Sequence, residues 1–66
     1  MDTNHQIPAT FDTPAAAARI GLRPATLATL RSRGGGPRYA KLGRTVRYRA
    51  ADLDAWVAAR LVGGDA

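Results

Sequence analysis

The stretch RYAKLGRTVRYR, residues 38–49, decides the fold because it predicts a β-hairpin. Gly43 and Arg44 separate two runs of strand-forming residues, and glycine at the first turn position favours a two-residue loop of type II′. Such a loop fixes the register of the two strands. Leu42 then faces Thr45, and the pairing continues outward until Arg38 faces Arg49.

The predicted hairpin has two unlike faces, because side chains alternate across a strand. The apolar face contains Tyr39, Val46, Tyr48 and the stem of Lys41, and the basic face contains Arg38, Arg47 and Arg49. Like charges directly opposite each other repel, so a hairpin with a purely structural role has no reason to pair Arg38 with Arg49. We therefore expect the aromatic rings to pack on helices and the basic face, with the tip at Arg44 and Thr45, to meet an acidic partner.

Upstream of the hairpin, the sequence DTPAAAARIG predicts a first short helix over residues 13–20. Asp12 or Thr13 can accept hydrogen bonds from the first-turn amides, and Pro14 suits the first turn. Gly21 tolerates the left-handed conformation that commonly follows a helix C-terminus. This helix is therefore expected to end just before Gly21.

A second helix is predicted to start at once, with Pro24 at its first position. Leu27 and Leu30 have the i, i+3 spacing of one helix face, and the run GGGP at residues 34–37 ends the pattern. Two short helices separated by a tight turn that contains glycine match the helix-turn-helix arrangement. The second helix of that arrangement can enter the major groove of DNA.

The segment after the hairpin, AADLDAWVAARLVGG, predicts a third helix. Its apolar face follows helical spacing and contains Leu53, Trp56, Val57, the stem of Arg60, and Leu61. Asp52 and Asp54 lie near its N-terminus, where the helix dipole favours anions. Trp56 is expected to anchor the core, so that Trp56→Ala costs about 3–5 kcal/mol of stability.

The chain has 66 residues, which suffices for one small domain that buries about 60% of its unfolded surface. We expect a flexible tail over residues 1–10, a domain over 11–62 and a flexible end over 63–66. The sequence has no cysteine and one histidine, His5, and it shows no metal-ligand spacing and no nucleophile beside a base. It therefore predicts no enzyme, no metal, no cofactor and no small-molecule ligand. The N-terminal run resembles neither a signal peptide nor a membrane span.

Charge is distributed unevenly along the chain, whose net charge is +5. Eight of the ten basic residues lie between Arg23 and Arg49, and all five aspartates lie outside that interval. A basic surface of this kind favours nucleic acid or an anionic membrane as partner. The absence of a basic amphipathic helix argues against the membrane, because the charge lies on the hairpin and turns.

The order of these elements resembles that of small helix-turn-helix proteins of the excisionase and AlpA type, distantly related to the N-terminal domain of MerR regulators. The resemblance covers residues 11–61, and its most specific pieces are GPRYAKLGRTVRYR and ADLDAW. It implies an α+β, mainly helical, winged helix-turn-helix fold in which the hairpin is the wing. It also implies that the second helix enters the major groove and that the wing contacts the adjacent backbone or minor groove.

Candidate DNA-contacting residues follow from the two apolar positions of the second helix, because the opposite face must point outward. For the recognition helix they are Arg23, Ala25, Thr26, Ala28, Thr29, Ser32 and Arg33; for the wing and backbone they are Arg31, Arg38, Lys41, Arg44, Thr45, Arg47 and Arg49. Threonine can offer a base edge a hydroxyl or a methyl group, and arginine can bind guanine or a phosphate. Relatives often have longer polar side chains at positions 25 and 28, and serine at position 23. We therefore expect few direct contacts with bases, and we expect affinity to come mainly from contacts with phosphates and from DNA shape.

Three functions fit this sequence. The first is an excisionase, or recombination directionality factor, whose copies coat and bend DNA beside an integrase. The second is an AlpA-like transcriptional regulator of a mobile element or prophage. The third is a basic module that binds membrane surfaces or proteins. For either of the first two we expect double-stranded DNA as partner, together with an integrase or other recombinase or with further copies of the chain on the DNA, in a bacterial or phage setting in the cytoplasm.

Overall fold

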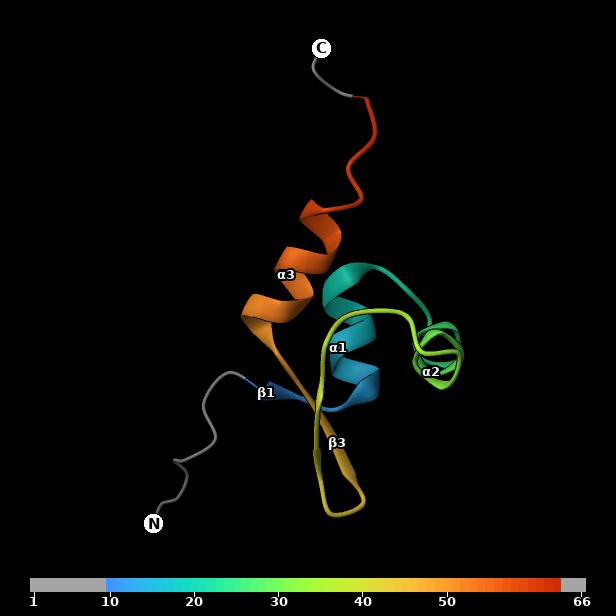
Figure 1. Ribbon diagram of the computed structural model, residues 1–66, viewed down its shortest axis with the longest axis vertical. Helices are drawn as coiled ribbons and strands as arrows, with labels where there is room; N and C mark the ends of the chain where they lie inside the picture. Colours follow the sequence, from blue (N-terminus) through green and yellow to red (C-terminus); the bar gives the residue numbers. More distant parts are fainter. Residues whose placement is uncertain (1–9, 64–66) are drawn as a thin grey trace.

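The computed structural model describes residues 10–63, which form three short helices and three short strands (Figure 1). In chain order the elements are β1 (Thr10–Phe11), α1 (Thr13–Ile20), α2 (Pro24–Ser32), β2 (Ala40–Leu42), β3 (Thr45–Arg49) and α3 (Ala50–Ala58). This order confirms the predicted α+β winged helix-turn-helix, with one strand more than the sequence indicated. The predicted tails, apart from Thr10 and Gly63, lie outside the described residues.

Local capping explains why α1 has these bounds. The Asp12 carboxylate accepts a hydrogen bond of 3.0 Å from the Ala15 amide, which satisfies one of the free N–H groups of the first turn. At the other end Gly21 has a φ of +79°, and the Leu22 amide donates to the Ala17 carbonyl. Both ends of α1 therefore form as the sequence predicted.

The helix α2 begins at Pro24 without a side-chain cap, because Arg23 stands at the capping position and makes no such bond. Its C-terminus is closed by two backbone bonds typical of a Schellman motif: the Gly34 amide donates to the Arg31 carbonyl, and the Gly35 amide to the Leu30 carbonyl. A left-handed residue is needed there, and Gly34 supplies it with a φ of +82°.

The hairpin forms in the predicted register, with Leu42 opposite Thr45, Lys41 opposite Val46 and Ala40 opposite Arg47. Gly43 has a φ of +66°, the positive value that a two-residue hairpin turn needs at that position. The β2–β3 ladder ends at Ala40, so the expected pairing of Arg38 with Arg49 is wrong. The rings of Tyr39 and Tyr48 nevertheless remain in contact beyond the ladder, with centroids 5.8 Å apart.

The sequence did not indicate β1, which pairs with the other edge of β3. Thr10 lies opposite Arg49 and Phe11 opposite Tyr48, and the strand order is β1-β3-β2. Two residues are too few to show an alternating pattern, so this strand gives no periodic signal. Its formation places β3 at the centre of the sheet.

The core is small and is centred on Tyr48, which is fully buried together with Leu27 and Leu53. Ala16 and Ala17 of α1 complete this hydrophobic cluster, and the half-buried side chains packed against it are Phe11, Ile20, Leu22 and Val46. The prediction that Trp56 anchors the core is wrong, because Trp56 is only half-buried and lies outside this cluster.

The outer part of α3 also departs from the expected buried face. Val57 is 38% exposed and Leu61 is 77% exposed, since the helix ends at Ala58 and α1 is only eight residues long. The C-terminal end of α1 reaches Asp54 through Arg19 and lies beside Val57, whereas Leu61 lies beyond the end of α3. The apolar face predicted through Leu61 is therefore buried at its beginning and exposed at its end.

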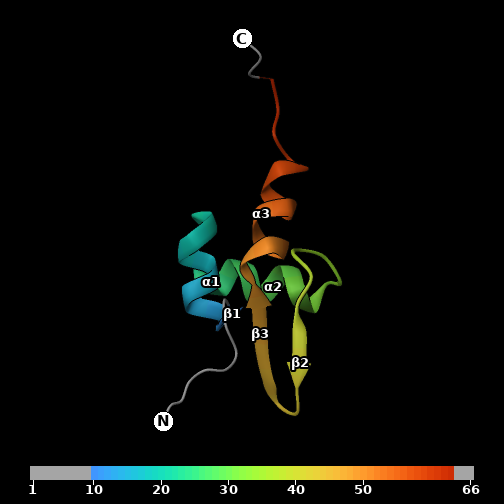
Figure 2. The same ribbon diagram turned by 90° about the vertical axis from the view of Figure 1, so that its left-hand side faces the viewer.

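The β2–β3 hairpin and α3 extend toward opposite ends of the molecule, and α2 lies at one side (Figures 1 and 2). The hairpin projects beyond the helices in both views. None of the helices within residues 10–63 has the length and apolar character needed to cross a membrane.

Candidate nucleic-acid interface

The outward face of α2 is short and has few polar groups. Ala25, Thr26 and Thr29 are exposed, and together with Leu30 and Arg33 they line a shallow hollow along the helix. The Ser32 hydroxyl, also exposed, donates a hydrogen bond of 2.9 Å to the Thr29 carbonyl, so its proton is already used within the helix. Ala28 is half-buried.

This face offers base edges two threonine side chains and the Arg33 guanidinium. The remaining predicted readers of α2 contribute a methyl group or, in Ser32, a hydroxyl whose proton is engaged. Such a surface can approach a major groove closely, but it can form few sequence-specific hydrogen bonds. The sparse readout expected from the sequence therefore stays a prediction, and it rests on these few exposed polar groups.

Exposed basic side chains stand at both ends of α2 and on the hairpin. They are Arg23 before the helix, Arg33 after it, and Arg38, Lys41 and Arg44 on the following loop and hairpin, with Thr45 exposed beside Arg44. Within residues 10–63 none of these five makes a side-chain hydrogen bond or a salt bridge. Arg38 lies near enough to Asp52 to help lower the pKa of that carboxyl, and the other four charges have no acidic partner of this kind among the described residues, so they are available to phosphates.

Arg31 differs from these residues, because its guanidinium is bound inside the fold. Nη1 donates hydrogen bonds of 3.1 Å to the Thr13 hydroxyl and 3.0 Å to the Tyr48 hydroxyl. The guanidinium also lies 5.9 Å from the centroid of the Tyr39 ring. One half-buried side chain of α2 thus contacts α1, β3 and the segment that leads into β2.

The spacing of α2 contained a signal for this position of Arg31. Residues 27, 30 and 31 follow the i, i+3, i+4 pattern of one helix face, so Arg31 shares the inward face with Leu27 and Leu30. Its positive charge alone suggested that Arg31 contacts DNA together with the wing residues. The sequence does not indicate that Thr13 and Tyr48 are its partners, because only the tertiary fold brings them next to Arg31.

Arg47 and Arg49, both predicted on the basic face of the wing, also have partners in the fold. Arg47 donates to the Thr10 carbonyl at 3.2 Å and to the Thr10 hydroxyl at 3.4 Å, so it ties β1 to β3. Arg49 forms a salt bridge of 2.7 Å with Asp52, and its side chain remains 60% exposed. This contact and its hydrogen bonds lower the pKa of the Asp52 carboxyl and raise that of Arg49.

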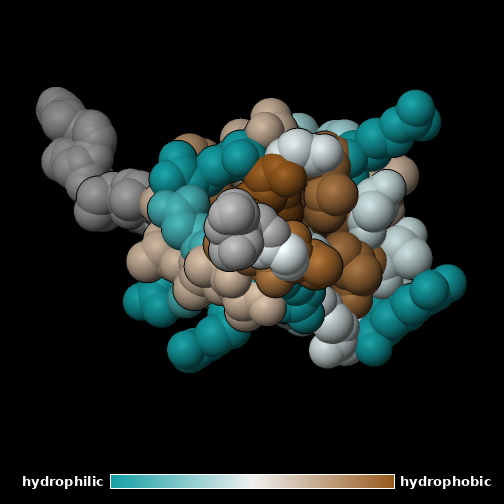
Figure 3. Space-filling model, turned by 90° about the horizontal axis from the view of Figure 1, so that it is seen from above, coloured by the Kyte–Doolittle hydropathy of each residue, from teal (hydrophilic) through white to brown (hydrophobic). Residues whose placement is uncertain are grey.

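At the end of the molecule away from the hairpin, the basic residues are occupied in a different way. Arg19 of α1 forms a salt bridge of 3.0 Å with Asp54 of α3, and the Arg60 guanidinium lies 4.2 Å from the Trp56 ring centroid. Apolar side chains gather at this end, as Figure 3 shows from above. Basic side chains without a partner among the described residues are thus concentrated around α2, the following loop and the hairpin.

A short helix with an exposed face of small side chains, followed by a projecting hairpin and flanked by basic side chains, defines a winged helix-turn-helix domain of the DNA-binding class. The helix-turn-helix domain family matches residues 10–61, and the chain belongs to this family. The match starts at β1 and continues past the end of α3, so it includes every element described above. No curated protein shows significant similarity to the chain.

Proposed function

We propose that the protein is an excisionase, a recombination directionality factor that binds several adjacent sites on duplex DNA and bends the duplex to assist an integrase. In this role it acts on the DNA of a mobile element or prophage in the bacterial cytoplasm. The contacts are those of the recognition helix and of the exposed cations around it and on the wing.

The observation that supports this proposal is the composition of the outward face of α2. Two threonines and one arginine can discriminate among few base pairs, and each well-recognised pair contributes about 1–3 kcal/mol. A single copy of so small a domain therefore binds with limited specificity, since single modules bury little DNA surface. Several copies on neighbouring sites overcome this limit, because their specificities combine when they bind cooperatively.

The exposed cations fit the same role. Arg23, Arg33 and Arg44 can each neutralise a phosphate without reading sequence, and such contacts position a protein along the duplex. An architectural protein depends mainly on contacts of this kind, together with the deformability of its site. Arg44 at the hairpin tip is the residue that we assign to the minor groove.

Footprinting on the DNA that flanks the gene tests the proposal. We expect adjacent direct repeats to be protected together over a narrow range of protein concentration, and we expect the bound duplex to migrate as bent DNA. A single compact footprint that overlaps a promoter, without bending, would instead identify a transcriptional regulator of the AlpA type. Equal affinity for anionic vesicles and duplex DNA would contradict both functions.

A further inference from the structure

Three consecutive glycines join α2 to the wing, and the fold accounts for two of them. Gly34 and Gly36 have φ values of +82° and +84°, which side chains rarely allow. At Gly36 an added Cβ would also lie 3.2 Å from the Leu30 Cβ, which is closer than ordinary contact. Both positions therefore require glycine for reasons internal to the chain.

Gly35 has neither reason. Its φ is outside the left-handed region, and an added Cβ would lie 3.7 Å from the nearest described atom, the Leu30 carbonyl oxygen, at ordinary contact distance. Gly35 also occupies the position after the left-handed residue of the Schellman motif, where an apolar side chain commonly packs back on the helix. Here that position has no side chain, so an internal packing role does not explain the glycine.

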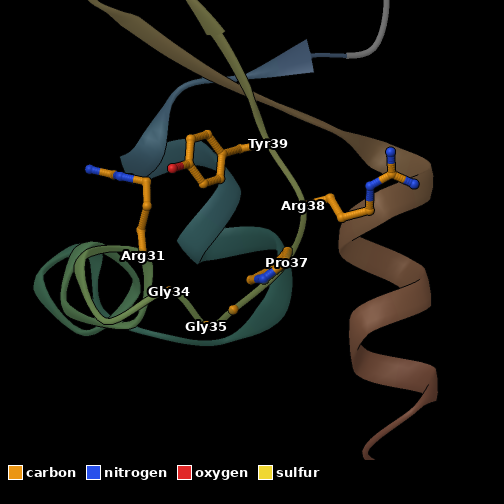
Figure 4. Close-up of a pocket in the computed structure, with 7 residues that line it drawn as sticks. Arg31, Gly34, Gly35, Pro37, Arg38 and Tyr39 are labelled. Carbon is orange, nitrogen blue, oxygen red and sulfur yellow. The ribbon is translucent and has the colours of Figure 1, made fainter.

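The surface around Gly35 is an open hollow of about 340 Å³, lined by Arg31, Gly34, Gly35, Gly36, Pro37, Arg38 and Tyr39. Figure 4 shows the loop as the floor of this hollow, with the side chains of Arg31 and Tyr39 on one side and that of Arg38 on the other. Arg31 Nη1 is held by two hydroxyls, so the orientation of its guanidinium is fixed. The Arg31 guanidinium points toward its partners Thr13 and Tyr48, and the Arg38 guanidinium lies beside α3, so the floor of the hollow is bare backbone between two basic side chains.

This hollow adjoins the recognition surface. The recognition surface has its own hollow along α2, which Leu30 and Arg33 line. Arg33 is followed directly by Gly34 of the loop, and the Leu30 side chain lies against Gly36. A duplex with its major groove on α2 therefore has one strand beside the loop. Glycine permits the closest approach of a backbone to a ligand, because no Cβ intervenes.

We propose that the glycine loop at residues 34–37 is a binding site for the sugar-phosphate backbone of duplex DNA, in which a phosphate rests against Gly35, with the Arg31 side chain on one side of the hollow and the Arg38 side chain on the other. This phosphate contact lies between the DNA contacts of the recognition helix and the DNA contacts of the wing. It rests on the DNA binding that the proposed function includes, and it serves an excisionase and a regulator equally.

The test compares Gly35→Ala with the unmodified chain in binding to a short duplex of unrelated sequence, at several salt concentrations. The added methyl group keeps the phosphate away, so we expect affinity to fall about tenfold. The log-log slope with salt should become shallower by about 0.9, the value of one phosphate. The thermal unfolding midpoint should stay the same or rise, because alanine at a compatible φ restricts the unfolded chain.

Two further variants support the comparison. Arg38→Gln removes a charge from the same hollow. If both residues contact the same phosphate, the double variant should lose less affinity than the product of the two single fold-losses. Ala58→Ser adds one atom at an exposed position near the end of α3, away from the hairpin, and should bind as the unmodified chain does.

Unchanged affinity of Gly35→Ala would overturn the site, and so would a clear drop in its unfolding midpoint, which would show that the fold itself requires the glycine. A different failure is recognisable separately. If the unmodified chain itself does not bind the duplex, DNA binding as a whole is refuted, and not this loop alone.

Discussion

Arg31 and Arg44 have the same side chain, yet their surroundings give them different roles. Arg44 stands at the exposed tip of the hairpin, whereas Arg31 is half-buried and donates to two hydroxyls. A buried guanidinium without such acceptors would destabilise the fold, because burial of an unpaired charge is costly. The hydroxyls of Thr13 and Tyr48 thus allow a charged residue on the inward face of α2.

Among the outward residues of α2, Thr29 is the one best placed to read a base. It is exposed, it lies in the middle of the helix, and its side chain lines the hollow along α2. We expect Thr29→Ala to change the order of preference among DNA sites while leaving affinity for unrelated duplex nearly unchanged, since a lost base contact affects specificity first. Binding-site selection from a random pool measures this preference.

If Thr29→Ala selects the same sites as the unmodified chain, α2 does not lie in the major groove through this face. Ser32→Ala is a suitable companion, because the Ser32 proton is already donated to the helix backbone. Its preference should change less than that of Thr29→Ala.

At the scale of elements, α3 shows how little of a helix needs to be buried in so small a domain. Leu53 is fully buried, whereas Trp56 is half-buried with Arg60 over its ring. We expect Leu53→Ala to cost about 2–5 kcal/mol, which is a large part of the stability of a domain of this size. Trp56→Ala should cost about 1–2 kcal/mol, because Trp56 lies outside the buried cluster and its buried Nε1 has no hydrogen-bond partner among the described residues.

Urea unfolding of the two variants, followed by circular dichroism, measures this difference. The reverse order, with Trp56→Ala the more damaging, would mean that the indole is part of the core. Tyr48 is less suitable for the comparison, because its substitution also removes one of the two hydroxyls that accept hydrogen bonds from Arg31.

Two salt bridges attach α3 to its neighbours and make stability depend on pH. Asp52 pairs with Arg49 and Asp54 with Arg19, and these hydrogen bonds lower both carboxyl pKa values below the ordinary 3.8. A lowered pKa in the folded state means that the stabilisation is complete above the unfolded value and is lost as pH falls through the folded one. We expect a constant unfolding midpoint from about pH 5 to 7 and a decline below about pH 4.

Thermal unfolding across this range checks the prediction. The double variant Asp52→Asn and Asp54→Asn cannot be protonated at these positions, so its decline in acid should be smaller than that of the unmodified chain. An identical acid decline in both proteins would assign the effect to other carboxyl groups.

Most elements of the fold could be predicted because local rules determine them. Asp12 caps α1, Gly21 ends it, and Gly43 fixes the hairpin register, and each of these acts on residues within a few positions. The strand β1 and the exposure of Trp56 could not be predicted, since each depends on which distant elements pack together. The same distinction applies to the candidate site.

In that site, the exposed residues of α2 and the tip of the hairpin follow from helix and hairpin geometry. The internal contacts of Arg31 and Arg47 do not, because their partners come from α1, β3 and β1, far away in the sequence. The contact of Arg49 with Asp52 is an i, i+3 pair, and its spacing was present in the sequence. Charge alone predicts that arginines gather in one region of the chain. It does not predict which of them the fold itself binds.

At the scale of the whole molecule, the exposed cations without a described partner determine how binding responds to salt. They are Arg23, Arg33, Arg38, Lys41 and Arg44. If each of them neutralises one phosphate, the log-log slope of affinity with salt is about −4.5. We expect Arg44→Ala to make this slope shallower by about 0.9 and to weaken binding to all sequences alike.

A matched control is Arg60→Ala, which removes the same charge at the end of the molecule away from the hairpin, where the guanidinium lies over Trp56. Fluorescence anisotropy with labelled duplex at a series of salt concentrations provides both slopes. Equal changes for the two variants would mean that net charge, and not the position of Arg44, governs binding.

The Arg31 guanidinium has one further consequence for the complex. One of its nitrogens donates hydrogen bonds to α1 and to β3, the central strand. These bonds restrain the movement of α2 relative to the projecting hairpin. Because the protein cannot adjust the spacing of these two elements, any adjustment needed to bring both into contact with the duplex must come from the DNA. Sequences with flexible steps between the two contact points would then be preferred even though no side chain touches them.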